Sequence, residues 1–245
     1  MKTLNIGHRG ASAYAPENTL AAFNLAFEMG ADGVELDVSL TKDGVPVVIH
    51  DDTVDRTTDG HGAIRDMTLE QVKRLDAGVK FDAKFRGEKI PTLAEVLTTV
   101  GERGIVNIEM KSGKLSNVGL ETAAVARVIE ETHAADRVII SSFNHFALHR
   151  MGDLNVRLPL GLLYFNRVPI SFPYAETRPL ARPTALHPRF VVVTDVFMRW
   201  ARGEKYTINT WTVDEPAEMR RLIALGVNSI MTNKPDVLYR VLAER

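Results

Sequence analysis

Short apolar segments that resemble strands alternate with helix-like segments along almost the whole of this 245-residue chain. Such an alternation predicts a parallel sheet covered by helices. No glycine-rich dinucleotide-binding motif follows the first strand, so we expect an α/β protein with a closed TIM (β/α)8 barrel rather than a doubly wound sheet. The expected strands are residues 4–8, 33–38, 45–50, 105–109, 138–141, 160–163, 184–186, 206–211 and 228–231. The expected helices are residues 20–29, 69–75, 93–103, 118–132, 145–151 and 216–225.

One long stretch, residues 41–91, interrupts the alternation after the second strand. It is too long for an ordinary connection between a strand and a helix, and it contains a strand, a short helix and the basic stretch 80–89. We interpret it as a small insertion beside the mouth of a single TIM-barrel domain that spans residues 1–245. A second irregular region, the proline-rich residues 166–183, is expected to form a flexible lip.

The composition excludes several classes of function. The formal net charge is -1, and no basic tail or stripe favours nucleic acid or an anionic membrane as the main partner. The chain has no cysteine, which rules out disulfides, thiolate metal sites and a cysteine nucleophile. No apolar leader or membrane-length apolar run is visible. We therefore expect a cytoplasmic protein without stable membrane association, although a secreted form that has lost its signal would look the same.

Charged side chains stand at the ends of several expected strands. The ends of parallel strands meet at one rim of a barrel, and gathering many charges there is costly unless they pair or bind something. The pattern therefore predicts a catalytic mouth. The segments concerned are His8-Arg9, Glu35-Leu36-Asp37, His50-Asp51 and Glu109-Met110-Lys111.

Three carboxylates stand out within this set. Glu35 and Asp37 are two residues apart on one strand, so their side chains should point the same way. Glu109 occupies the matching end of the next core strand. Oxygen ligands without a thiolate suit a hard divalent cation, Mg²⁺ or Ca²⁺. The alternative is that these are solvated acids with local salt bridges.

Two histidines, His8 and His50, each end a strand and each precede a charged residue. An imidazole titrates near neutral pH, so the pair could remove one proton and deliver another. They could instead be metal ligands, or one could be a hydrogen-bonded structural residue. The remaining histidines lack this context and are expected to be peripheral: His61, His133, His145, His149 and His187.

Arg9 and Lys111 are the cations of the same set. Beside a metal they would suit a phosphate, and they could also neutralise neighbouring carboxylates. Trp211 ends a strand and offers a flat apolar wall for the rest of a substrate, unless it is simply a core residue. The chain has no nucleophile elbow, Walker loop or zinc-type His-Glu-x-x-His motif. Metal-assisted phosphoryl chemistry is therefore the reaction class that remains.

A series of short motifs runs in order from His8 to Pro235. They are His8-Arg9-Gly10, Pro16-Glu17-Asn18-Thr19, Glu35-Leu36-Asp37, His50-Asp51, Arg56-Thr57-Thr58-Asp59-Gly60, Ile108-Glu109-Met110-Lys111, Ser142-Phe143, Trp211-Thr212-Val213 and Thr232-Asn233-Lys234-Pro235. In these motifs the chain resembles the glycerophosphodiester phosphodiesterases, most closely their short cytosolic bacterial members, with one departure: Asn233 stands where the family often has aspartate.

The resemblance implies a role for each candidate residue. Glu35, Asp37 and Glu109 would hold a divalent ion, and Arg9 and Lys111 would contact the phosphate. His8 and His50 would be the general acid and base. The barrel would carry a small insertion after its second strand, and a glycerophosphodiester would be cleaved to glycerol 3-phosphate and an alcohol.

A mechanism follows from these implied roles. One histidine would deprotonate the glycerol 2-hydroxyl, which would attack phosphorus within the same molecule, and the other would protonate the departing alcohol. Water would then open the cyclic phosphate. Direct attack by water on phosphorus is the competing route.

The sequence leaves other functions open. One is a lysophospholipase D or a phosphoinositide-cleaving phosphodiesterase on the same barrel, and another is a non-catalytic barrel that binds a phosphate ligand. The expected partner is a small-molecule glycerophosphodiester, and a homodimer is left open.

Overall fold

Eight parallel strands form a closed barrel in the part of the chain that the structure, a computed structural model, describes: residues 2–111, 118–154, 157–165 and 182–244. The order is β1-β9-β8-β7-β6-β5-β4-β2, and β2 pairs back with β1 to close the ring. The predicted TIM barrel is therefore confirmed. The strands are β1 (Leu4–His8), β2 (Gly33–Leu40), β4 (Ile105–Met110), β5 (Val138–Ser142), β6 (Leu160–Tyr164), β7 (Ala185–Pro188), β8 (Thr207–Thr210) and β9 (Ser229–Thr232).

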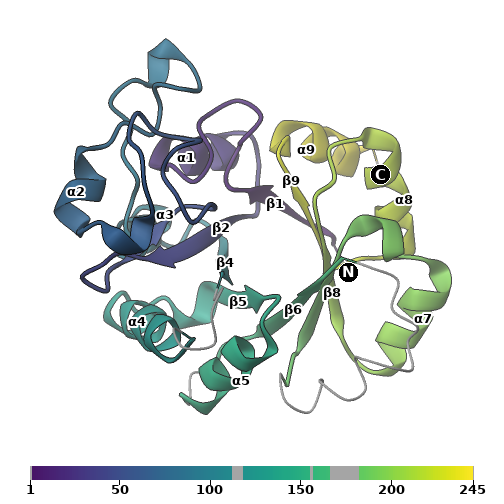
Figure 1. The fold of residues 1–245 in the computed structure, drawn as a ribbon. Coiled ribbons are helices and arrows are strands. Elements are labelled where there is room, and N and C mark those ends of the chain that lie inside the picture. Colours follow the sequence, from purple (N-terminus) through teal and green to yellow (C-terminus); the bar gives the residue numbers. More distant parts are fainter. Residues whose placement is uncertain (1, 112–117, 155–156, 166–181, 245) are drawn as a thin grey trace.

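Helices surround the strands on the outside of the barrel (Figure 1). They are α1 (Leu20–Glu28), α3 (Leu93–Val100), α4 (Val118–Glu131), α5 (His145–Asp153), α7 (Asp195–Gly203), α8 (Pro216–Leu225) and α9 (Pro235–Ala243), with short 3₁₀ turns η4 (Ala135–Arg137) and η5 (Phe190–Val192). Helices α7 and α9 were not among those expected from the sequence. No helix in the described ranges has both the length and the apolar character to cross a membrane. The predicted lip at residues 166–183 lies outside the described residues except for its last two.

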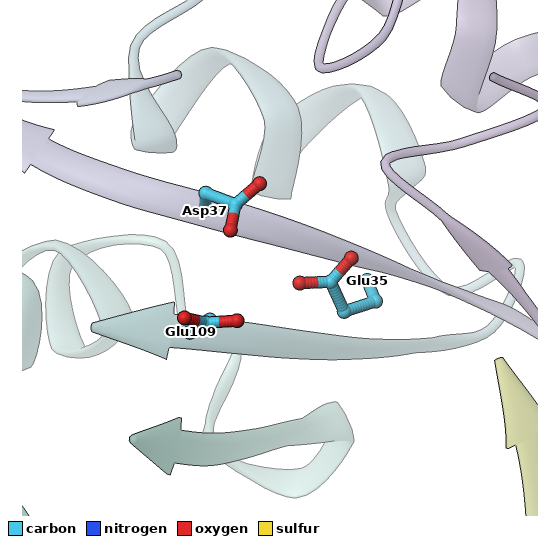
Figure 2. Close-up of side chains that lie close together, drawn as sticks. All are labelled: Glu35, Asp37 and Glu109. Atoms are coloured by element: carbon cyan, nitrogen blue, oxygen red, sulfur yellow. The ribbon is translucent and has the colours of Figure 1, made fainter. Parts of the chain in front are cut away.

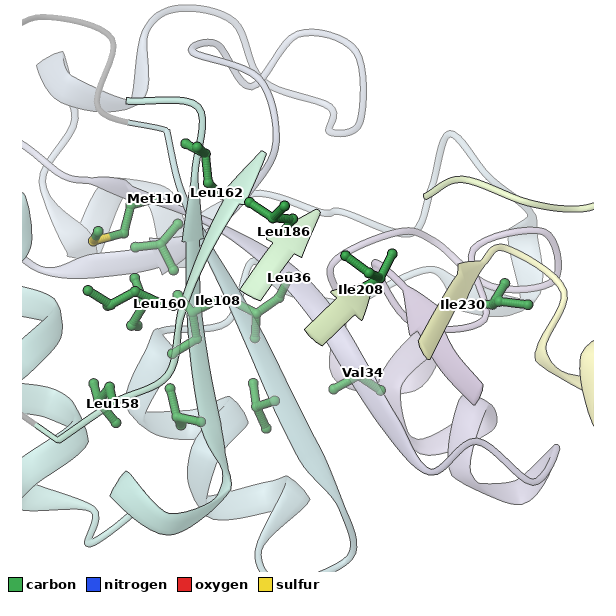
Figure 3. Packing of buried hydrophobic residues seen from close by; sticks show 14 of the residues in the cluster. Val34, Leu36, Ile108, Met110, Leu158, Leu160, Leu162, Leu186, Ile208 and Ile230 are labelled. Atoms are coloured by element: carbon green, nitrogen blue, oxygen red, sulfur yellow. The ribbon is translucent and has the colours of Figure 1, made fainter. Parts of the chain in front are cut away.

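The side chains of each strand alternate between the helices and the barrel interior. Val34, Leu36 and Ile108 are fully buried in the cluster that joins the strands to the helices (Figure 3). Glu35 and Asp37, which alternate with Val34 and Leu36 along β2, therefore point into the barrel. Because of this alternation, β2 packs apolar side chains against the helices and carries its acids on the face that points into the barrel.

The barrel interior also holds a buried histidine. His187 on β7 is fully buried, and its Nε2 lies 2.9 Å from the amide nitrogen of Asn209 on β8. Gly161 on β6 leaves the space for the ring, because a Cβ there would lie 2.3 Å from that Nε2. The expectation that His187 is peripheral is wrong: it faces inward, where no neighbouring sequence pattern marks a polar site.

The insertion is a small layer with its own apolar core. Its strand β3 (Pro46–Val48) runs antiparallel to β2 and is shorter than the predicted segment 45–50. The other elements are η1 (Ile64–Asp66), α2 (Leu69–Arg74) and η2 (Ala83–Phe85). The insertion core consists of Val47, Ile49, Val54, Ile64, Val72, Ala77 and Ile90. This layer places His50 just after β3, beside β2. That residues 1–245 form a single domain stays a prediction.

Candidate active site

The loop after β1 bends sharply, and this bend brings the side chains of Arg9 and Asn18 to the mouth. Arg9 has a φ of +55° and Gly10 a φ of +84°, both in the left-handed region. A Cβ on Gly10 would lie 2.6 Å from the backbone of Ala22, so only glycine fits there. Asn18 is also left-handed, with a φ of +59°, and its side-chain amide donates to Asp37 Oδ2 at 2.9 Å. Strained backbone of this kind often marks functional sites.

The three predicted acids meet at the mouth. Glu35 and Asp37 come from β2 and Glu109 from β4, where Asp37 and Glu109 are register partners (Figure 2). One carboxylate oxygen from each lies within 4.8 Å of the others. Burial, then repulsion from the other two acids, raises the pKa of Glu35 well above its usual value. Burial and Asp37 likewise raise the pKa of Glu109.

Two cations partly compensate this negative charge. Lys111 Nζ lies 2.7 Å from both Asp37 Oδ1 and Glu109 Oε1, and Arg9 Nε lies 3.3 Å from Asp37 Oδ2. Burial alone would raise the pKa of Asp37, but these two cations lower it. Three acids beside two cations leave an excess of negative charge. Carboxylates that repel one another and offer only oxygen atoms as ligands suit a hard divalent cation.

His8 is held by a neutral amide. Its Nδ1 lies 2.7 Å from Asn233 Oδ1, and the Asn233 amide nitrogen donates to Asp214 Oδ2 at 2.7 Å. Because Asp214 fixes the amide orientation, Nδ1 of His8 must donate, and Nε2 carries the free lone pair. Burial, and then Arg9, lowers the pKa of His8 to about 4. The sequence analysis did not predict this role for Asn233, whose loop follows β9, the barrel neighbour of β1.

His50 is held by a carboxylate. Its Nδ1 lies 2.6 Å from Asp51 Oδ1. Hydrogen bonds from Arg56 lower the pKa of Asp51 to about 2, so Asp51 stays ionised. This geometry leaves Nε2 as the nitrogen of His50 that can exchange a proton, as in His8. The sequence analysis named Asp51 as part of a motif but assigned no contact to it.

The other side of the mouth is aromatic. Trp211 follows β8, and its indole N–H donates to the backbone oxygen of His187 at 2.7 Å. Phe143 follows β5 and Phe165 follows β6, and their rings stack with centroids 4.5 Å apart. Trp211 meets both edge-on, at 5.8 Å and 5.2 Å. Neither Phe165 nor the role of Phe143 was predicted from the sequence, although each residue directly follows a strand.

The structure thus brings most of the predicted site residues together and leaves Trp211 apart from them. Six of them form one connected cluster, and His50 lies near enough to lower the pKa of Asp37 and Glu109 through its charge. Trp211 lies after β8, across the barrel from β2 and β4. The cluster consists of His8, Arg9, Glu35, Asp37, Glu109 and Lys111.

Comparisons with known proteins point to one family. Residues 8–237 match the Glycerophosphoryl diester phosphodiesterase family. The chain is 45% identical to a glycerophosphodiester phosphodiesterase of Caldanaerobacter subterraneus subsp. tengcongensis, over 99% of this chain and 98% of the relative. It is 35% identical to one of Bacillus altitudinis, over 97% of each.

One solved structure bears on the ligand. A phosphodiesterase of Oleispira antarctica, solved in complex with the product sn-glycerol-3-phosphate, superposes with a TM-score of 0.90 and 29% identity. The match covers 97% of this chain and 96% of that one.

Proposed function

Because the chain belongs to the glycerophosphoryl diester phosphodiesterase family and is a glycerophosphodiester phosphodiesterase, we propose that it cleaves its substrates to glycerol 3-phosphate and an alcohol with a bound divalent cation and two histidines. The observation that carries this proposal is the cluster of three acids, two buried and one half-buried, whose carboxylate oxygens lie within 4.8 Å of one another beside two histidines and two cations. The glycerol 3-phosphate complex of the Oleispira antarctica relative supports the product.

Glu35, Asp37 and Glu109 would hold the cation, Mg²⁺ or Ca²⁺, because they supply oxygen donors only. When bound, the cation would offset the negative charge of the phosphodiester. Arg9 and Lys111 would contact the phosphate oxygens. Lys111 has three N–H donors and directs the ammonium at two carboxylates, so a third donor can meet the substrate.

His8 and His50 would transfer protons through Nε2, because each Nδ1 is already bonded, to Asn233 and to Asp51. One would take the proton of the glycerol 2-hydroxyl, whose oxygen then attacks phosphorus. The other would protonate the departing alcohol oxygen. Water would afterwards open the cyclic phosphate. This route needs no nucleophilic side chain, and direct attack by water is its alternative.

Trp211, with Phe143 and Phe165, would form the wall that receives the alcohol. Phe143 is 36% exposed and Phe165 is 53% exposed, so part of this aromatic surface is open to a ligand. That openness favours a second candidate, a lysophospholipase D activity, in which the glycerol carries an acyl chain and the products are a lysophosphatidate and the head-group alcohol. A cytoplasmic location and no stable membrane association remain predictions, and a homodimer is left open.

The test is a purified-protein assay of glycerol 3-phosphate release from glycerophosphodiesters and of head-group alcohol release from a lysophospholipid. The substrates are glycerophosphodiesters with small head groups and a lysophospholipid, each with Mg²⁺, Ca²⁺ or excess chelator. We expect release with a divalent cation and none with chelator. No release from any glycerophosphodiester would refute the proposed activity, and full activity in chelator would refute the metal dependence.

A further inference from the structure

An ion-pair bridge connects the insertion with the loop after β1, outside the cluster of acids. Arg56 in the insertion contacts two carboxylates at once. Its Nε and Nη2 donate to Asp51 Oδ2 at 2.6 Å and Oδ1 at 3.1 Å. Its Nη1 and Nη2 donate to Glu17 Oε2 at 2.8 Å and Oε1 at 2.7 Å. The planar guanidinium thus forms a bidentate pair on each side.

Each end of this bridge holds a group that the proposed reaction needs. Asp51 accepts the hydrogen bond that orients His50, at 2.6 Å. Glu17 accepts from Arg9 Nη1 at 2.9 Å, through the same Oε1 that Arg56 contacts. His50 and Arg9 belong to different loops, so the bridge fixes one relative to the other.

The solvent access of Arg56 argues against a mainly structural role. Its side chain is 49% exposed, whereas those of Asp51 and Glu17 are 30% and 20% exposed, and ion pairs that are open to solvent on one side contribute less to folding stability than buried ones. Burial would raise the pKa of Glu17, but the two arginines lower it, so Glu17 is ionised and accepts from both. Lysine could not replace Arg56, because an ammonium has no planar fork to meet two carboxylates bidentately.

We propose that Arg56 and Glu17 are positioning residues that set the distance between His50, through Asp51, and Arg9. This inference rests on the proposed function of those two groups. Neither residue needs to touch the substrate. Loss of the bridge would leave the acids in place but loosen His50, which would transfer a proton, and Arg9, which would contact the phosphate. Misplacement of such a group by about 1 Å can cost about 100-fold in rate.

The experiment measures kcat and KM of the purified enzyme for a glycerophosphodiester in saturating divalent cation. For Arg56→Ala we expect kcat to fall about 10- to 100-fold while the melting temperature stays near that of the wild type. Added guanidinium, below denaturing concentrations, should restore part of kcat. Asp51→Asn should lower kcat with little change in KM, whereas Glu17→Gln should also raise KM because Arg9 is loosened.

The matched control is Arg74→Ala. Arg74 belongs to the same insertion and pairs only at the surface with Glu70, so kcat and KM should not change. Arg56→Ala activity within about twofold of the wild type would overturn the proposal, a threshold well below the expected loss. A loss that follows the fraction of unfolded protein and resists guanidinium rescue would also overturn it. An inactive wild type would instead refute the proposed function.

Discussion

His187 should make the protein measurably less stable in mild acid. It lies fully buried inside the barrel, and burial lowers its pKa to about 3. The hydrogen-bond pattern agrees. Ser229 Oγ donates to Asn209 Oδ1 at 2.8 Å, which turns the amide nitrogen of Asn209 toward His187 Nε2. His187 Nε2 must therefore accept this hydrogen bond, and a proton on Nε2 would face the N–H donor of Asn209.

The sign and size of the effect follow from linkage. In the unfolded chain the imidazole has a pKa of about 6.5, so below that pH the unfolded state takes up a proton that the folded state refuses. Stability therefore rises with pH between about 3, the pKa of folded His187, and 6.5. From pH 6.5 to pH 5 is about 1.5 units at about 1.36 kcal/mol each, so this group should remove about 2 kcal/mol of unfolding free energy at pH 5.

Urea unfolding of the wild type and His187→Gln, at pH 7.5 and at pH 5.0, measures this difference. Glutamine keeps an acceptor for Asn209 and does not titrate. The other titrating groups are common to both proteins, so the wild type should lose about 2 kcal/mol more than the variant between the two pH values. His61→Gln, at a highly exposed histidine, should behave like the wild type. An equal loss in wild type and His187→Gln would show that His187 is not buried in its neutral form.

Three further predictions concern the site. Glu109→Gln should keep the fold but weaken divalent-cation binding sharply, and a thermal shift with added Mg²⁺ or Ca²⁺, present in the wild type and lost in the variant, checks this. His8→Ala and His50→Ala should each lower kcat by about 10²–10⁴-fold while cation affinity, measured by calorimetry, changes much less; a variant that loses the cation instead would be a ligand. An analogue without the glycerol 2-hydroxyl should bind without reacting, and equal rates on the analogue and the natural diester in a product-release assay would favour direct attack by water.

The barrel could be predicted because its strands are short apolar runs that alternate with helix-like segments. Each predicted barrel strand overlaps an observed one, and the boundaries differ by up to two residues. The helix α9 was missed because Pro235 appeared to close the chain's last motif. In the structure it occupies the first turn of the helix, where a proline needs no hydrogen bond. The helix α7 was missed although Phe197, Met198 and Ala201 have helical spacing and are buried.

The acids and the two histidines could be predicted because each is a polar residue in or just after an apolar strand segment, although β2 continues beyond Asp37 to Leu40. The supporting groups could not, because their partners are distant in sequence: Asn233 is 225 residues from His8, and Arg56 is 39 residues from Glu17. Barrel closure brings the first of these pairs together, and the fold of the insertion brings the second. Neither event leaves a local pattern. His187 was misjudged for a related reason, since Gly161 on the adjacent strand makes the space for its ring.

Some groups of the site are carried by strands and others by loops. Two acids come from one strand and the third from its register partner, so the ladder itself fixes their spacing. His50 and Arg9, by contrast, follow strands in loops, and side-chain bonds to Asp51 and Glu17 hold them. Loops tolerate substitution better than strands. Substitutions in these loops should therefore change the reaction rate while the fold and the acid cluster persist. They should also change the preference for the alcohol, because Phe143, Phe165 and Trp211 stand in loops just after strands.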